Sequence, residues 1–124
     1  MWASRIAELV NLKEGLVSRQ IFFSEEIYKR ELERIFARSW LFLGHDSQIP
    51  NPGDYLTNYM GEDPIIVVRD SGGRIRAFLN SCAHRGMKVC RYDQGNALLF
   101  TCPFHAWTYD TKGKLVGAAY HAAE

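Results

Sequence analysis

Residues 82–86 read Cys-Ala-His-Arg-Gly, and residues 102–107 read Cys-Pro-Phe-His-Ala-Trp. Each segment places a cysteine and a histidine within two or three positions of each other, directly after strand-like sequence. Thiolates and imidazoles are both metal ligands, so this repeated pairing predicts a metal centre built from two loops. The candidate ligands are Cys82, His84, Cys102 and His105.

The mixture of ligands favours an iron–sulfur centre. In a [2Fe–2S] cluster, two imidazoles on one iron raise the reduction potential to about −150 to +300 mV, against about −400 mV for plant-type centres with thiolates alone. Cys82 and Cys102 would hold one iron and the two histidines the other, so each loop would contribute to both irons. Structural zinc is the alternative, although zinc fingers usually pair like ligands, as C-x-x-C with H-x-x-x-H.

Short apolar segments separated by turn residues surround the two loops. Such spacing is typical of an antiparallel β-sandwich or barrel. Residues 85–101, between the loops, are expected to contain one hairpin that brings both loops to the same end of a sheet. The segments with strand character are 40–43, 55–60, 65–68, 75–79, 97–101, 107–109 and 114–116.

A helical arm is expected before this β region. Ser24 is a suitable N-cap because its hydroxyl can accept a backbone N–H of the first turn, and two glutamates follow it. We therefore predict an N-terminal helical arm at residues 1–39 and a small, mainly β domain at residues 40–124. One face of the predicted helix carries apolar residues that would dock onto a core: Ile27, Leu32, Ile35 and Phe36.

Composition excludes several classes of function. The formal net charge of +1 argues against a nucleic-acid-binding protein. No apolar run approaches the roughly 20 residues that span a bilayer, and the N-terminus lacks the layout of a signal peptide. The three cysteines are an odd number, which fits a reducing compartment better than a disulfide framework. A cytoplasmic protein without nucleic-acid or membrane partners is expected.

The two loops resemble the cluster-binding loops of the Rieske family. The wider sequence, over residues 12–118, is similar to the alpha (large) subunit of bacterial aromatic-ring-hydroxylating dioxygenases. This likeness is carried by Leu43-Gly44-His45, Ile49-Pro50, Pro52-Gly53-Asp54-Tyr55, Asn80-Ser81-Cys82, Arg85-Gly86-Met87 and Gly95-Asn96-Ala97.

The resemblance implies a domain that relays single electrons from a ferredoxin or reductase. The acceptor would be a mononuclear non-haem iron that cis-dihydroxylates an aromatic ring, with a neighbouring alpha subunit and a small beta subunit as further partners. That iron would lie in a C-terminal catalytic domain outside these 124 residues, so we assign no catalytic residue and expect a piece of a longer protein. The alternatives are a stand-alone Rieske-type electron carrier and a zinc-stapled binding module.

The resemblance also gives meaning to single positions. Respiratory Rieske proteins carry one extra cysteine in each loop, where this chain has Met87 and Phe104, so the resemblance implies the type without a disulfide. The family usually has glycine at the position of Ala106, where a positive φ would cost alanine about 1 kcal/mol.

Other chemically notable residues receive simpler interpretations. Cys90 is interpreted as a small buried hydrophobic residue, and Trp107 as a neighbour of the second loop or a core residue. Arg85 is expected to be exposed near the cluster, either solvated or paired with an acid of a neighbouring domain. His45 and His121 are interpreted as non-ligands because neither lies in a comparable motif.

Overall fold

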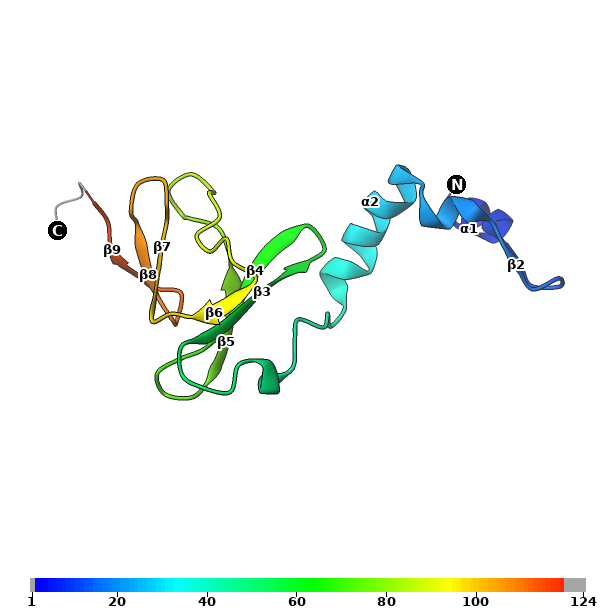
Figure 1. Cartoon of the computed structure of the whole chain (residues 1–124). Helices are drawn as coiled ribbons and strands as arrows, with labels where there is room; N and C mark the ends of the chain where they lie inside the picture. The colour runs from blue at the N-terminus through cyan, green and yellow to red at the C-terminus, as the bar shows by residue number, and fades with distance from the viewer. Residues whose placement is uncertain (1, 120–124) are drawn as a thin grey trace. The chain divides into compact units, whose positions relative to one another are not determined.

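The computed structural model describes residues 2–119, and His121 lies outside the described residues. The chain divides into two compact units, Met1–Trp40 and Leu41–Glu124. Figure 1 shows helices in the first unit and antiparallel strands in the second. No helix among residues 2–119 combines the length and the apolarity needed to cross a membrane.

The first unit is a short helical arm with one small β-ladder. Gly15 adopts a φ of +66° in the turn between the two strands of this ladder. The predicted N-cap is confirmed, since the Ser24 hydroxyl accepts the Ile27 N–H at 3.4 Å. None of the residues of α2 is buried, so docking of its apolar face onto a core stays a prediction. The elements are α1 (Trp2–Leu9), β1 (Val10–Asn11), β2 (Leu16–Val17), η1 (Arg19–Phe22), α2 (Glu25–Arg34) and η2 (Phe36–Arg38).

The second unit contains two open antiparallel sheets. The four-stranded sheet has the order β5-β4-β3-β6 and the three-stranded sheet the order β7-β8-β9. The prediction of antiparallel β structure is confirmed, whereas the barrel alternative is wrong because the sheets do not close on each other. The elements are η3 (Asp46–Gln48), β3 (Asp54–Met60), β4 (Asp63–Arg69), β5 (Ile75–Leu79), β6 (Gln94–Asn96), β7 (Leu99–Thr101), β8 (Thr108–Asp110) and β9 (Leu115–Gly117).

Two local predictions were wrong. Residues 40–43 form no strand, since the Leu43 carbonyl accepts a hydrogen bond from the Asn58 side chain at 2.7 Å instead of pairing in a ladder. The segment between the loops contains β6 and β7, but these strands do not form a hairpin with each other. β6 pairs with β3 and β7 pairs with β8, so this segment crosses from one sheet to the other.

The core lies on both faces of β4, whose run of branched residues is almost fully buried. Ile66 and Val68 face a cluster shared with Phe100 of the other sheet, while Ile65 and Val67 face a smaller cluster around Ile49. Successive side chains of β4 face the two clusters in turn, because side chains alternate between the two faces of a strand. The larger cluster also contains Tyr55, Cys82, Val89, Cys90, Cys102 and Tyr109, so both cysteines of the predicted centre belong to the core.

Tyr55 makes this core sensitive to alkaline pH. Burial, together with a hydrogen bond to Cys90, raises the pKa of Tyr55 from 10.0 to about 12. A folded-state pKa above the unfolded value stabilises the fold below pH 10, and this contribution is lost as pH rises towards 12. We expect the free energy of unfolding to fall by on the order of 2–3 kcal/mol across this window, and to fall less in Tyr55→Phe. Urea unfolding at several pH values measures this loss. An equal loss of unfolding free energy in the wild type and in Tyr55→Phe would contradict the prediction.

Candidate functional site

The first loop, residues 82–87, follows β5 and closes on itself through two backbone hydrogen bonds. The Cys82 N–H donates to the Met87 carbonyl at 2.8 Å, and the Cys82 carbonyl accepts the Gly86 N–H at 2.8 Å. Gly86 adopts a φ of +73°. This tight turn carries the Cys82 side chain inward and leaves His84 exposed.

The second loop, residues 102–107, follows β7 and repeats the same geometry. The Cys102 N–H donates to the Trp107 carbonyl at 2.8 Å, and the Cys102 carbonyl accepts the Ala106 N–H at 3.0 Å. Ala106 adopts a φ of +60° and is the one non-glycine residue with positive φ in the described part of the chain. The two loops are thus equivalent turns, with Gly86 and Ala106 at corresponding positions.

The positive φ of Ala106 destabilises the fold, as expected for an alanine at a position where the family usually has glycine. We expect Ala106→Gly to raise the free energy of unfolding by about 1 kcal/mol, because glycine adopts positive φ without a Cβ clash. Gly86→Ala is the matched control and should lower it by a similar amount. A Cβ at Gly86 would meet only Ser81 Oγ, at 3.8 Å, so this cost is conformational. Urea unfolding measures both changes, and equal stability of all three proteins would refute the argument.

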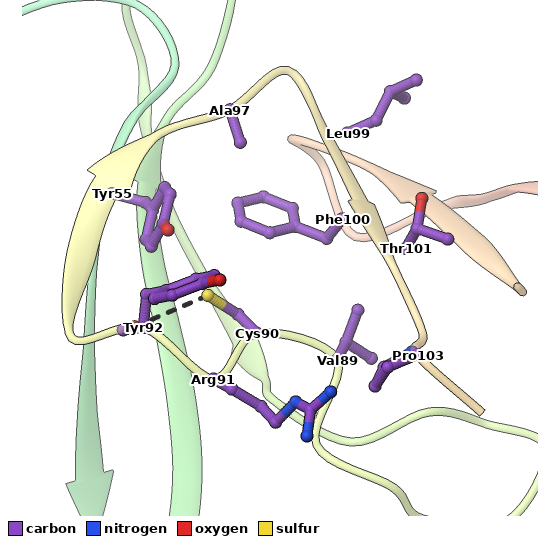
Figure 2. A pocket seen from close by; sticks show the side chains of 10 residues that line it. All are labelled: Tyr55, Val89, Cys90, Arg91, Tyr92, Ala97, Leu99, Phe100, Thr101 and Pro103. Carbon is purple, nitrogen blue, oxygen red and sulfur yellow. Dashed lines mark hydrogen bonds between the residues drawn. The ribbon is translucent and has the colours of Figure 1, made fainter.

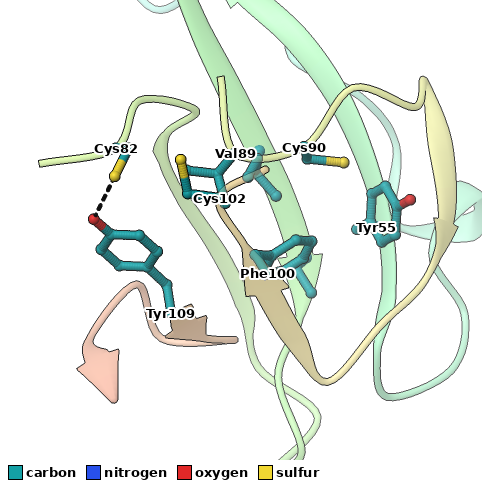
Figure 3. Packing of buried hydrophobic residues seen from close by; sticks show 9 residues of the cluster. Tyr55, Cys82, Val89, Cys90, Phe100, Cys102 and Tyr109 are labelled. Carbon is teal, nitrogen blue, oxygen red and sulfur yellow. Dashed lines mark hydrogen bonds between the residues drawn. The ribbon is translucent and has the colours of Figure 1, made fainter. Parts of the chain in front are cut away.

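The four predicted ligands come together as two pairs of like donors. Cys82 and Cys102 are each 3% exposed and lie in the same buried cluster (Figure 3), and the Cys102 side chain contributes to lowering the pKa of Cys82. The Nδ1 atoms of His84 and His105 lie 3.1 Å apart, with ring centroids separated by 4.7 Å. Each pair takes one member from each loop. Within residues 2–119, no three His, Cys, Asp or Glu side chains gather around a point that could hold a single ion.

The hydroxyl of Tyr109 in β8 lies against the Cys82 thiol (Figure 3). This hydroxyl accepts the Ala83 N–H at 2.9 Å and lies 3.3 Å from Cys82 Sγ, so its own hydrogen is free to point at the sulfur. Burial by itself raises the pKa of Cys82, but hydrogen bonds from Tyr109, from the His84 backbone and from Cys102 outweigh it and leave that pKa lowered. The site therefore favours negative charge on this sulfur.

Aromatic rings flank the two imidazoles. Trp107 stacks on the His84 ring, with centroids 4.9 Å apart and planes inclined by 15°. The Phe104 ring lies next to the His105 ring, with centroids 4.2 Å apart. Trp107 also packs against the larger buried cluster, so both interpretations of this residue hold.

The Asn80 side chain forms hydrogen bonds with the backbone of residues 89 and 90, which follow the first loop. This side chain is 2% exposed. Asn80 Oδ1 accepts the N–H groups of Val89 and Cys90 at 2.9 and 2.8 Å, and Nδ2 donates to the Cys90 carbonyl at 2.6 Å. Sequence reasoning quoted Asn80 only as part of a motif and missed Tyr109. For Asn80, the available signal was its position as a polar residue two positions before Cys82.

The remaining notable residues lie outside the two pairs. Cys90 is buried, as predicted, with its sulfur 3.6 Å from the Tyr92 carbonyl. His45 caps η3 by accepting the Ser47 N–H. Arg85 is exposed, as predicted.

Comparisons with known proteins match this chain over nearly all of its length. It is 56% identical over 120 residues to biphenyl 2,3-dioxygenase subunit alpha of Rhodococcus jostii (strain RHA1), which covers 96% of this chain and 26% of that subunit. It is 54% identical over 119 residues to benzene 1,2-dioxygenase subunit alpha of Pseudomonas putida, with the same coverage. The chain therefore spans about a quarter of the length of these relatives.

A solved structure and a family model match the same part of the chain as these relatives. Naphthalene 1,2-dioxygenase from Rhodococcus sp. superposes with a TM-score of 0.78 and 50% identity, over 84% of this chain and 24% of that chain. The family model described as the Rieske [2Fe-2S] domain matches residues 39–123. Since that match includes both loops and both sheets, the chain belongs to the Rieske [2Fe-2S] domain family.

Proposed function

We propose that Cys82, His84, Cys102 and His105 hold the [2Fe–2S] cluster of this domain. The observation that carries this assignment is the pairing of like donors, thiol with thiol and imidazole with imidazole, across the two loops. The donor set fits the group, because a Rieske centre places two thiolates on one iron and two imidazoles on the other. A tetrahedral zinc ion would instead need all four donors around one point.

The chain's own residues define how the site would work. When bound, the cluster supplies a one-electron redox centre of raised potential. The buried thiols anchor it to the core, and the Tyr109 hydroxyl places a hydrogen bond on one sulfur. The exposed His84 and the half-buried His105 form the edge that a partner reaches. Residues 1–39 serve as an arm to the domain at 40–124.

We infer that the intact protein is the alpha subunit of an aromatic-ring-hydroxylating dioxygenase. The names of the relatives, which act on biphenyl and benzene, support an aromatic hydrocarbon as substrate class. In that protein this domain relays single electrons from a ferredoxin or reductase to a mononuclear iron in the remaining part of the subunit. A neighbouring alpha subunit and a small beta subunit are the further partners. The free cysteines of the described chain support a reducing compartment, the cytoplasm.

Electron paramagnetic resonance of the dithionite-reduced chain tests the cluster assignment, with iron and acid-labile sulfide assayed on the same sample. We expect a rhombic signal of low average g and equal iron and sulfide, as a histidine-ligated [2Fe–2S] centre requires. A colourless, silent protein with stoichiometric zinc, even after iron–sulfide reconstitution, would refute the assignment.

Tyr109→Phe tests the hydrogen bond to sulfur. Loss of the O–H donor removes a contact that favours negative charge, so the reduction potential should fall by a few tens of mV, while the cluster content stays unchanged. Tyr92→Phe is the control, because the Tyr92 side chain is 75% exposed. Spectroelectrochemical titration measures both, and a potential equal to that of the wild type in Tyr109→Phe would show that the contact does not tune the centre.

A further inference from the structure

The two sides of the loop pair differ sharply in charge. Between Ala83 and Tyr92 the chain carries three cations and no acid. All three are exposed, and among residues 2–119 none of them forms an ion pair. We call Arg85, Lys88 and Arg91 the basic flank.

The segment that contains the second loop differs from the basic flank in charge. From Gln94 to Tyr109 the chain contains neither an acid nor a lysine or arginine. Its exposed residues include large apolar side chains, with Leu98, Leu99 and Phe104 exposed by 63%, 55% and 54%, beside the uncharged polar residues Gln94, Asn96 and Thr101. A pocket of about 520 Å³ is lined by Arg91 of the basic flank and by Leu99 and Pro103 of the uncharged segment (Figure 2).

The basic flank is held in place. The three hydrogen bonds of Asn80 fix the backbone at residues 89 and 90, between two of its cations. Lys88 Nζ donates to the Tyr59 hydroxyl and lies 4.8 Å from the centre of that ring. Lys88 and Arg91 line one pocket of about 310 Å³, in which Asp93 is the one acid. Lys88 and Arg91 are therefore presented on a fixed surface, in the segment of chain that follows His84.

We infer that the basic flank is the docking surface for the electron donor, an acidic one-electron carrier protein. This inference rests on the proposed electron-relay function. Redox encounters are small and transient, and opposite charges steer them and raise the association rate. With a cluster held by the four proposed ligands, the reduced carrier would lose one electron and the centre would gain it, and no bond would be made or broken.

Equilibrium binding tests the surface independently of electron flow. The probe is an acidic plant-type [2Fe–2S] ferredoxin, with both proteins oxidised and the full chain carrying its cluster. At about 10 mM salt, where the Debye length is about 30 Å, Lys88→Glu and Arg91→Glu should each weaken binding about tenfold. At about 1 M salt, where charges are screened beyond about 3 Å, the difference should vanish.

Arg74→Glu is the matched control. Arg74 is exposed, precedes β5 at the end remote from the first loop, and its reversal changes the net charge equally. It should weaken binding less than twofold. Stopped-flow measures the second-order rate constant with which the reduced ferredoxin reduces the cluster of each variant. This rate constant should fall in Lys88→Glu and Arg91→Glu and change little in Arg74→Glu.

Two results would overturn the inference while the proposed function stands. One is an equal loss of binding in Arg74→Glu and Arg91→Glu, which would reflect net charge alone. The other is no salt-dependent binding by a wild-type chain whose reduced cluster gives its normal resonance signal. Absence of that signal in the wild type would instead overturn the proposed function, and the inference with it.

Discussion

Replacement of Cys102 by alanine is expected to abolish cluster binding. Cys102 is 3% exposed and lies in the same buried cluster as Cys82, so alanine would remove one of the two proposed thiolate ligands. Thiolates anchor iron–sulfur clusters, and an iron left with one protein thiolate is labile. Iron and sulfide per chain should fall to background after reconstitution, and the visible absorption should disappear.

Cys90→Ala is the control for this loss. Cys90 is also buried within the same cluster of core residues, and its removal leaves a similar small cavity. It should retain full iron and sulfide content with a modest loss of stability. Equal loss of iron in both variants would mean that burial rather than ligation explains the result, whereas retention of the cluster in Cys102→Ala would remove this residue from the ligand set.

Replacement of His84 by cysteine is expected to lower the reduction potential by on the order of 100 mV or more. A thiolate donates more negative charge to iron than a neutral imidazole does, and centres with four thiolates lie several hundred mV below Rieske centres. His84 Nδ1 lies beside that of His105, and its ring stacks on Trp107, so the new thiol would enter a defined position.

Spectroelectrochemical titration with parallel iron and sulfide assays measures this change. His45→Cys is the matched control, because His45 is exposed and caps η3 instead of joining the two pairs. Its potential should equal that of the wild type. An unchanged or raised potential in a cluster-containing His84→Cys protein would count against His84 as a ligand.

Local sequence patterns predicted the elements whose cause is local. The hydroxyl of Ser24 is a good cap wherever a helix begins, and the predicted cap is confirmed. Residues 65–68 are branched and apolar on both faces, as the central strand β4 requires, and residues 75–79 coincide with β5. The prediction failed at 40–43, because an apolar run is compatible with packing on a core without pairing in a sheet.

The ligand candidates also came from local signals, because Cys82 with His84 and Cys102 with His105 are each close in the chain. The grouping of like donors was expected from cluster chemistry, and the structure places the Nδ1 atoms of His84 and His105 3.1 Å apart, while the ligand assignment stays a prediction. Other features depend on contacts between distant residues. Tyr109 reaches Cys82 across 27 positions, and nothing near it in sequence marks it as a donor to sulfur.

By itself, then, the sequence determined the antiparallel β class, the cap of α2 and the four candidate ligands, since each follows from residue type and short spacing. Only the tertiary structure decided that the segment between the loops crosses between two sheets, that the loops are equivalent turns with Ala106 at positive φ, and that Arg91 and Leu99 line one pocket. The physical reason is that strand pairing and surface segregation depend on which distant segments meet, and hydrophobic burial determines this for the chain as a whole.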